Sequence, residues 1–453
     1  MARSPGASGP RAGLRRGDGD AVIVAMTDDR FHRSLAALWR MEAPRLVARI
    51  ARMVGDVGIA EDLAQDVHVA ALERWPVDGL PDNPAAWLTT AARRRAIDHL
   101  RQRTLHAQRQ AEYGADLETF GDDMQQDHAA RDADDPIGDD LLRLMFVACH
   151  PALPRESRVA LTLRLLGGLT TAEIARAFLQ PEPTVAQRIV RAKRTLSEKQ
   201  VPFEVPPRAE LPERLDAVLE VVYLVFNEGY AASAGEDWMR PALCEEALRL
   251  GRVLAGLMPA ADEALGLLAL MELQASRAKA RVAADGRPIL LPEQDRSRWD
   301  RLQIQRGLAA LDRAQRLAVA AGTTPGPYTL QAAIAACHAR ALRAADTDWA
   351  RIAALYGVLA RTSPSPVVEL NRAVAIAQAQ GPAAALPLID ALREDPALRG
   401  YALLHAARGD LLLKLDRRDE ARAEFERAAE LAGNARDGAL MRERAGGCAK
   451  APD

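Results

Sequence analysis

The chain has few cysteines, few aromatic residues and almost no net charge. Its four cysteines lie far apart in the 453 residues, so neither a disulfide framework nor a zinc site is predicted, and we expect reduced, buried thiols. The 60 Lys and Arg residues nearly balance the 62 Asp and Glu residues, which gives a formal net charge of -2. No global basic field therefore indicates a polyanion partner, and any nucleic-acid surface must be local.

Long apolar segments are also missing. No stretch approaches the roughly 20 uninterrupted apolar residues of a membrane span. The first 20 residues are rich in Gly, Pro and Arg and lack the apolar segment of a secretory signal. We therefore predict no membrane association, a cytoplasmic location, and a disordered tail over residues 1–25. The sequence is compatible with a translation start at either Met1 or Met26.

Alternating β-branched patterns are nearly absent, whereas Ala, Leu, Arg and Glu, all strong helix formers, are abundant. The sequence therefore predicts an all-α protein, and its length suggests about three domains. An Asp-crowded stretch and a Pro-rich stretch, Val201 to Pro212, interrupt the helical pattern. The predicted parts are a helical unit over 26–107, an acidic flexible linker over 108–139, a second helical unit over 140–203, and a long helical array over 204–453.

The array contains a weak internal repeat with the small and aromatic positions of a tetratricopeptide unit, whose period is about 34 residues. One copy places small, small, aromatic and small residues at Gly409, Ala421, Phe425 and Ala428, and an earlier copy uses Ala373, Ala385, Ile389 and Leu392. This pattern predicts stacked helical hairpins with a concave surface for a partner.

A helix-turn-helix pattern occupies "LTTAEIARAFLQPEPTVAQRIVRAKRTL". Thr170 and Glu173 form a predicted capping box for the first helix, and Thr184 is the predicted cap of the second. In such a motif the second helix enters the major groove. We expect it to bury Val185, Ile189, Ala192 and Leu196 and to present Thr184, Gln187, Arg188, Arg191, Lys193 and Arg194 to DNA. The alternative is an ordinary hairpin with a solvated charged face.

The first helical unit contains "NPAAWLTTAARRRAIDHLRQR", in which arginines dominate one helix. Arginines contact phosphates, and a nearby aromatic residue can stack on an unpaired base, as a binder of melted DNA requires. The candidates for this contact are Trp87, Arg93, Arg94, Arg95, Arg101 and Arg103. For Trp87 considered alone, a place in the core is the favoured interpretation.

Just upstream, "AEDLAQDVHVAALERWP" predicts a helix with an acidic face made by Asp62, Asp66 and Glu73. Such a face repels phosphate, so it points to a basic protein partner or to solvent.

Together these motifs resemble bacterial extracytoplasmic-function sigma factors. The acidic and arginine-rich helices resemble region 2, and the helix-turn-helix resembles region 4, in the same order and with a similar spacer. The segments "VVYLVFNEGYAAS", "PEQDRSRWD", "GPYTLQAAIAACHA" and "SPVVELNRAVA" resemble the subgroup with a long tetratricopeptide-like C-terminal extension.

The resemblance implies a transcription initiation factor that binds core RNA polymerase through the β′ clamp helices and the β flap. It implies that Asp62, Gln65 and Asp66 contact the polymerase. It implies that the −10 element is contacted by Trp87, Arg93, Arg94, Arg95 and Arg101. The second helix of region 4 is then expected to contact the −35 element. It implies neither catalysis nor a cofactor, metal or small-molecule substrate.

The extension is expected to regulate the factor through its own sigma domains, the polymerase or another protein. Whether it activates or inhibits the factor is left open. The alternative function is an operator-binding regulator or helical scaffold that acts without polymerase.

The polar stretch "DGRPILLPEQDRSRWD" is the remaining place where acidic and basic residues gather. No nucleophile, phosphate-binding loop or metal spacing accompanies them, so a salt-bridged loop between hairpins is expected rather than a catalytic site.

Overall fold

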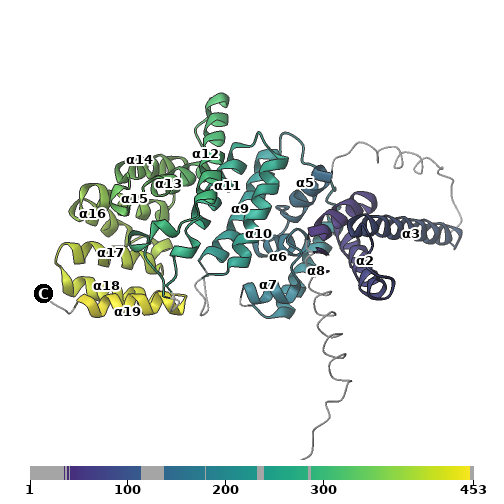
Figure 1. Ribbon diagram of the computed structural model, residues 1–453, viewed down its shortest axis with the longest axis horizontal. Coiled ribbons are helices and arrows are strands. Elements are labelled where there is room, and N and C mark those ends of the chain that lie inside the picture. Colours follow the sequence, from purple (N-terminus) through teal and green to yellow (C-terminus); the bar gives the residue numbers. More distant parts are fainter. Residues whose placement is uncertain are drawn as a thin grey trace, which may run out of the picture. The chain divides into compact units, whose positions relative to one another are not determined.

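The computed structural model describes residues 35, 38, 39, 41–113, 137–178, 180–231, 239–283 and 287–448. Within these ranges the chain is helical (Figure 1), with no strand and one isolated bridge between Val282 and Pro288. The prediction of an all-α protein is confirmed. The predicted disordered tail and the two candidate start methionines lie outside the described residues.

The chain divides into two compact units. The first consists of Met1–Val54 and Ile59–Asp122, and the second consists of Asp123–Asp453 with the short segment Gly55–Gly58. The arginine-rich helix therefore belongs to the first unit. The helix-turn-helix and the long array belong together to the second.

The first unit contains a helix over residues 41–54 and two longer helices, α2 (Val57–Asp78) and α3 (Pro84–Tyr113). Asn83 begins α3: its side-chain oxygen accepts a bond from the Ala86 amide at 3.0 Å, and Pro84 fits the first turn because it needs no donor there. The helices meet through fully buried side chains that include Ile50, Val67 and Leu88. This packing leaves the opposite faces of α2 and α3 exposed.

The second unit begins with four short helices, α5 (Ile137–Ala148), α6 (Arg155–Leu165), α7 (Thr171–Ala177) and α8 (Glu182–Glu198). Helix α3 continues to Tyr113 and α5 begins at Ile137, so helix occupies both ends of the predicted linker over 108–139. The rest of that segment lies outside the described residues.

The array that follows consists of eleven α-helices within the described residues. Consecutive helices pack against each other, as in α11 on α12 and α17 on α18. Their bounds are α9 (Leu211–Tyr230), α10 (Pro241–Leu257), α11 (Asp262–Ala275), α12 (Arg301–Ala321), α13 (Pro327–Arg340), α14 (Trp349–Thr362), α15 (Pro366–Gln380), α16 (Pro382–Leu392), α17 (Ala402–Lys414), α18 (Arg418–Leu431) and α19 (Ala435–Cys448).

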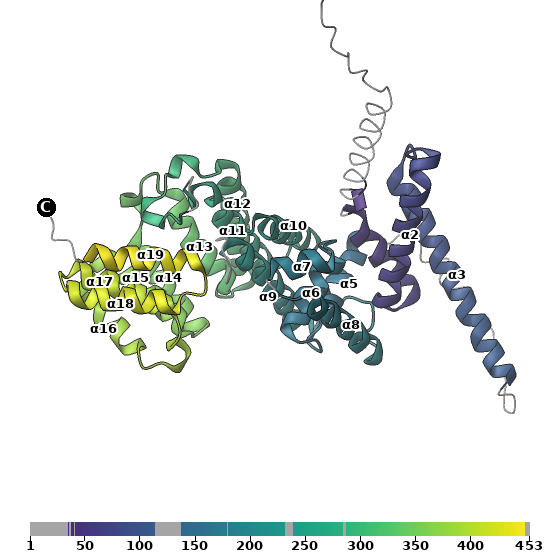
Figure 2. The ribbon, with the colours of Figure 1, turned by 90° about the horizontal axis from the view of Figure 1, so that it is seen from below.

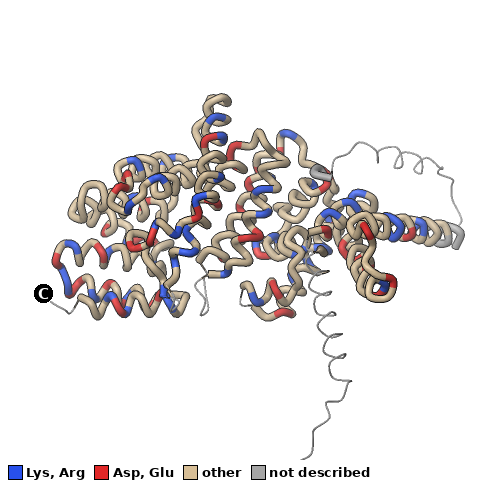
Figure 3. The backbone as a smooth tube through the Cα atoms, viewed as in Figure 1, with Lys and Arg blue, Asp and Glu red and all other residues tan. Residues whose placement is uncertain are grey.

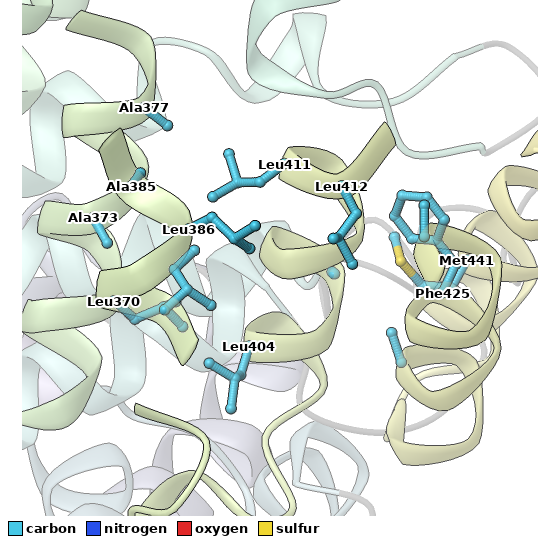
Figure 4. Close-up of a cluster of buried hydrophobic side chains, with 14 of the residues drawn as sticks. Leu370, Ala373, Ala377, Ala385, Leu386, Leu404, Leu411, Leu412, Phe425 and Met441 are labelled. Carbon is cyan, nitrogen blue, oxygen red and sulfur yellow. The ribbon is translucent and has the colours of Figure 1, made fainter. Parts of the chain in front are cut away.

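The predicted repeat coincides with hairpins α15–α16 and α17–α18. Phe425 is fully buried, and a Cβ atom built on Gly409 would lie 2.8 Å from Cε1 of the Phe425 ring, so only glycine lets these two helices approach so closely. In Figure 4, Phe425 lies beside Met441, while Leu411 and Leu412 of α17 lie between α18 and the helices α15 and α16. One apolar core therefore joins the last five helices.

The Pro-rich stretch Val201–Pro212 connects the four short helices to the array, but it does not hold them apart. Helices α5 and α6 pack directly on α9, and α5 also contacts α10 (Figure 2). Arg214 Nη2 donates to the Phe146 carbonyl at 2.8 Å, and Glu220 pairs with Arg155 at 3.0 Å and with Arg158 at 3.4 Å. Sequence reasoning missed this contact because it took a cluster of prolines as a spacer. The structure instead forms one continuous unit here.

All four cysteines are buried and none is in a disulfide, as predicted. Burial raises the pKa of the Cys149 thiol to about 11 and that of Cys244 to about 12, so both are protonated at neutral pH. No helix in the described ranges is long and apolar enough to cross a bilayer.

Candidate nucleic-acid and polymerase interfaces

Helices α7 and α8 form the predicted helix-turn-helix. The capping box of α7 is present: the Glu173 amide donates to Thr170 Oγ1 at 3.1 Å, and the Thr170 amide donates to the Glu173 carboxylate at 2.8 Å. The inner face of α8 is buried as predicted, at Val185, Ile189, Ala192 and Leu196. The opposite face is therefore available for a partner outside this unit.

Helix α8 begins earlier than the sequence suggested. Pro181 occupies the cap position, Glu182 and Pro183 form the first turn, and the Thr184 amide donates to the Pro181 carbonyl at 3.0 Å. Thr184 thus lies inside the first turn and does not cap the helix, which corrects our prediction. The reason is that a proline at the start of a helix loses no hydrogen bond and has a suitable φ angle.

The candidate DNA-contacting residues of α8 are not equally exposed. Thr184, Gln187, Arg191 and Arg194 are exposed, whereas Arg188 and Lys193 are half-buried at the edges of the face. Successive helical residues are rotated by about 100°, which puts Arg188 and Lys193 roughly 100–120° away from Gln187, on either side. Arg188 donates to the Gln180 side chain in the turn, so in this structure it positions the turn.

Arg194 is also engaged, since it pairs with Glu198 one turn further along at 2.6 Å. The hydrogen bond and the charge of Glu198 raise the pKa of this exposed guanidinium. An exposed i,i+4 pair contributes little stability and can open when a phosphate competes for the arginine.

Val190 is a candidate that the sequence analysis did not include. It is 63% exposed and lies on the same face as Gln187, Arg191 and Arg194. An exposed apolar side chain on a recognition helix can contact the methyl group of thymine. Its sequence signal is an apolar residue at a helical position that the periodicity of α8 places on the exposed face.

Helix α3 carries the arginine cluster of the first unit. Its inner face is formed by Leu88, Ala92 and Ala96, each at most 1% exposed. Basic residues recur along the rest of the helix (Figure 3). The exposed ones include all the arginines predicted to contact the −10 element, namely Arg93, Arg94, Arg95 and Arg101, together with Arg103.

Trp87 is partly in the core and partly at the surface, so it combines the two positions considered for it. Its ring is half-buried and packs edge-on against Trp75 of α2, with centroids 5.3 Å apart and planes at 70°. Trp75 is only 2% exposed, so it holds one side of Trp87 in the core while the rest of the ring reaches the surface.

The acidic face of α2 is also exposed. Asp62, Asp66 and Glu73 are exposed and Gln65 is half-buried, while the adjacent Glu61 is only 5% exposed. Buried Glu61 is the one carboxylate of this cluster that the sequence analysis did not single out.

The acidic and arginine-rich faces come together at one point. Asp66 Oδ2 lies 3.9 Å from Arg95 Nη1, and both side chains are about half exposed. A pair that is this long and this exposed contributes little to stability. The two faces are therefore neighbours on one small unit, which brings an acidic and a basic surface next to each other.

The described part of the polar stretch before α12, which does not include Asp285, forms helix caps. Asp295 accepts the Ser297 amide at 2.9 Å, and Asp300 caps α12 through the amides of Leu302 and Gln303. Arg296 is buried and donates to backbone carbonyls. Across the described part of the chain, no group of three or more His, Cys, Asp or Glu residues could hold a metal ion.

Three family matches agree with this geometry. Sigma-70 region 2 matches residues 38–105, and sigma-70 region 4 matches residues 143–196. Residues 214–315 match a family of unknown function, DUF6596. The region 2 match covers α2 and most of α3, and the region 4 match contains α6, α7 and nearly all of α8.

Similar proteins extend these matches to most of the chain. A protein of Rhizobium meliloti (strain 1021), described as uncharacterized, is 44% identical over 399 residues, or 88% of this chain and 92% of the relative. The extracytoplasmic-function (ECF) RNA polymerase sigma factor SigK of Mycobacterium ulcerans (strain Agy99) is 31% identical over 34% of this chain and 78% of its own length. No solved structure matches the chain.

A probable ECF sigma factor SigI of Mycobacterium tuberculosis (strain ATCC 25618 / H37Rv) is 29% identical over 39% of this chain and 59% of its own length.

Sigma factor function, with core RNA polymerase and promoter DNA as partners, follows from the presence of both regions. An operator-binding regulator is not favoured, because it would not need region 2. Sigma factors are generally not enzymes. The chain therefore belongs to the extracytoplasmic-function RNA polymerase sigma factors, with regions 2 and 4 followed by a long helical C-terminal extension.

Proposed function

We propose that this sigma factor acts in the cytoplasm through three surfaces and without catalysis or a cofactor. The acidic face of α2 binds the β′ clamp helices, the arginine face of α3 holds the −10 element, and α8 reads the −35 element while region 4 contacts the β flap. The observation that carries the proposal is the exposure of oppositely charged faces on α2 and α3 of one unit. A single charged face would fit simple DNA binding, whereas two adjacent ones fit a protein that joins an enzyme to DNA.

The polymerase-binding surface is formed by Asp62, Gln65 and Asp66. These residues lie on one side of α2, opposite the buried Val67 and Ala71. The side chains of Asp62 and Asp66 are exposed on this side of the helix, and charge complementarity with a basic partner steers association and sets orientation. When the polymerase binds the acidic face, Asp66 no longer pairs with Arg95. Arg95 is then able to contact DNA.

Core binding gives a direct test of this surface. We expect Asp62→Ala/Asp66→Ala to weaken binding to purified core polymerase by about tenfold or more, because two charge contacts are lost. Asp78→Ala is the matched control: Asp78 is an exposed carboxylate on the same helix but on another side. Equal affinities of the double variant and the wild type, measured by fluorescence anisotropy, would place the polymerase contact elsewhere.

The −10 surface consists of Trp87, Arg93, Arg94, Arg95 and Arg101. The arginines are exposed along two turns or more of α3, which suits contacts with successive phosphates. The outward part of the Trp87 ring, supported from behind by Trp75, can stack on an unpaired base.

The −35 surface consists of Thr184, Gln187, Arg191 and Arg194, with Arg188 and Lys193 at its edges. Gln187 and Arg191 are one turn apart on the exposed face, where side chains can make paired hydrogen bonds to base edges. Arg188 donates to Gln180 through Nη1 only, which leaves other N–H groups of its guanidinium for a contact with DNA.

Substitution on α8 should weaken −35 recognition specifically. We expect Gln187→Ala and Arg191→Ala each to cost about 1–3 kcal/mol of binding to a −35 duplex, because a base or phosphate contact is removed. Arg422→Ala, at an exposed arginine of α18, should bind like the wild type. Gel-shift titration at constant salt measures this, and full affinity in both α8 variants would exclude α8 as the reading helix.

The extension shares one unit with region 4, yet it leaves the outer face of α8 exposed. We infer that it supports region 4 from behind, through the contacts of α9 and α10 with α5 and α6. This arrangement favours a positive role for the extension in transcription over masking of the −35 surface.

A further inference from the structure

The middle of the extension contains a cavity that the sigma function does not use. Its volume is about 200 Å3, and it lies among α11, α13, α14 and the loop before α12. Much of its wall is apolar or aromatic, including Leu270, Leu273, Ile334 and Tyr356, and among the described residues no Asp or Glu lines it. A cavity of roughly 150 Å3 is large enough for benzene, so this one has room for an aromatic ring with a small substituent.

Arg277 provides a positive charge at this cavity. The side chain is half-buried, and its Nη2 donates to the Tyr230 hydroxyl at 2.6 Å and to Gln274. Among the described residues, no carboxylate lies within 4.0 Å of this guanidinium, and its Nε and Nη1 have no protein acceptor. A guanidinium that is partly removed from water and has no counter-ion can bind an anion.

Two further polar groups of the same cavity have no partner within the described residues. Trp299 is 3% exposed, and its indole Nε1–H is buried without an acceptor. His338 Nδ1 is likewise buried and unbonded. An unsatisfied buried polar group is costly, so such groups in a folded protein call for a missing partner.

A second buried arginine adds to the positive field. Arg296 is 6% exposed, and its guanidinium lies 5.0 Å from the centre of the Trp299 ring, while that of Arg277 lies 5.8 Å from it. Arg296 bonds to the carbonyls of His338 and Ala341 and to Thr347, and no carboxylate of the described residues pairs with it. His338 adds no charge near neutrality, because burial and then the charges of Arg277 and Arg296 lower its pKa to about 4.

We propose that this cavity binds a small carboxylate with an apolar, ring-sized body, with Arg277 as the anchor of the carboxylate and Trp299 and His338 as further hydrogen-bonding groups. The apolar walls take the body of the ligand, and the acceptor oxygens satisfy groups that the protein leaves unbonded. Nη1 of Arg277, which has no protein acceptor among the described residues, can donate a charge-assisted hydrogen bond to a carboxylate oxygen. The proposal goes beyond the sigma function, since it gives the extension a ligand, and it does not depend on polymerase or promoter binding.

Calorimetric titration of the full-length chain with benzoate tests this site. Benzoate has the charge and size that the cavity fits, and benzamide is its neutral counterpart. We expect saturable binding of one benzoate per chain, and binding of benzamide weaker by about tenfold or more, because the charge-assisted contact is lost. Either the absence of saturable benzoate binding or equal binding of benzamide would overturn the proposal.

Two variants locate the binding. Arg277→Gln should reduce benzoate affinity by about tenfold or more, whereas Arg298→Gln should leave it unchanged, because Arg298 is an exposed arginine of the same loop that does not line the cavity. If Arg277→Gln fails to fold, Arg277→Lys, which keeps the charge but replaces the planar guanidinium by a shorter ammonium side chain, takes its place and should weaken binding. Unchanged affinity in the folded variant would assign the binding to another site. Loss of benzoate binding with intact transcription would separate this proposal from the sigma function.

Discussion

A chain that ends at Pro206 is expected to lose transcription rather than to gain it. Helix α9 contributes fully buried side chains, among them Val222 and Phe226, and α5 and α6 pack directly on this helix. Removing α9 exposes apolar surface of region 4 and leaves Arg155 and Arg158 without Glu220. We expect initiation by the truncated chain to fall by about tenfold or more, since region 4 is no longer held in place.

Multi-round transcription with the full-length and truncated chains measures this effect. Glu220→Ala is the point control, because it removes the ion pairs but keeps the apolar contacts, and partly exposed pairs contribute only about 0–1 kcal/mol. It should remain near wild-type activity. A truncated chain that initiates better than the full-length protein would show that the extension masks the sigma domains, contrary to our account.

The second large effect concerns the stability of the C-terminal hairpins. We expect Phe425→Ala to lower the free energy of unfolding of this region by about 3–5 kcal/mol, because a fully buried ring is replaced by a cavity that helices α17 to α19 cannot close. Urea unfolding followed by circular dichroism measures the loss.

A companion experiment tests the close approach of the two helices. Gly409→Ala should also destabilise, because its Cβ would lie 2.8 Å from the Phe425 ring. Adding Phe425→Leu to Gly409→Ala should recover part of that loss, since the smaller side chain makes room. A loss below about 1 kcal/mol for Phe425→Ala would mean that these hairpins do not depend on the repeat core.

The helical class and the repeat could be predicted because both depend on local patterns. The buried face of α8 follows from apolar residues one turn apart, and the pair formed by Gly409 and Phe425 follows from the repeat. The capping box at Thr170 is a four-residue signal and was also predictable.

The remaining features depend on contacts between distant residues. The start of α8 at Glu182 was missed because Thr184 was taken as the cap of the helix, although proline is favoured in a first turn. The contact of Arg214 with Phe146 joins residues 68 positions apart, and no periodic pattern encodes it. The cavity beside Arg277 likewise combines three helices and a loop. Its unbonded groups become visible only when the chain is folded.

Run-off transcription with purified bacterial core polymerase, on the DNA upstream of the protein's own operon, tests the central claim most directly. Our account predicts initiation at a defined start site by the wild type. It also predicts loss of initiation in the folded Asp62→Ala/Asp66→Ala variant, whose α8 still binds −35 DNA. If the wild type binds duplex DNA but starts no transcript there or on a promoter library, the sigma function itself is contradicted. If the double variant initiates as well as the wild type, the assignment of the acidic face of α2 to polymerase binding is wrong.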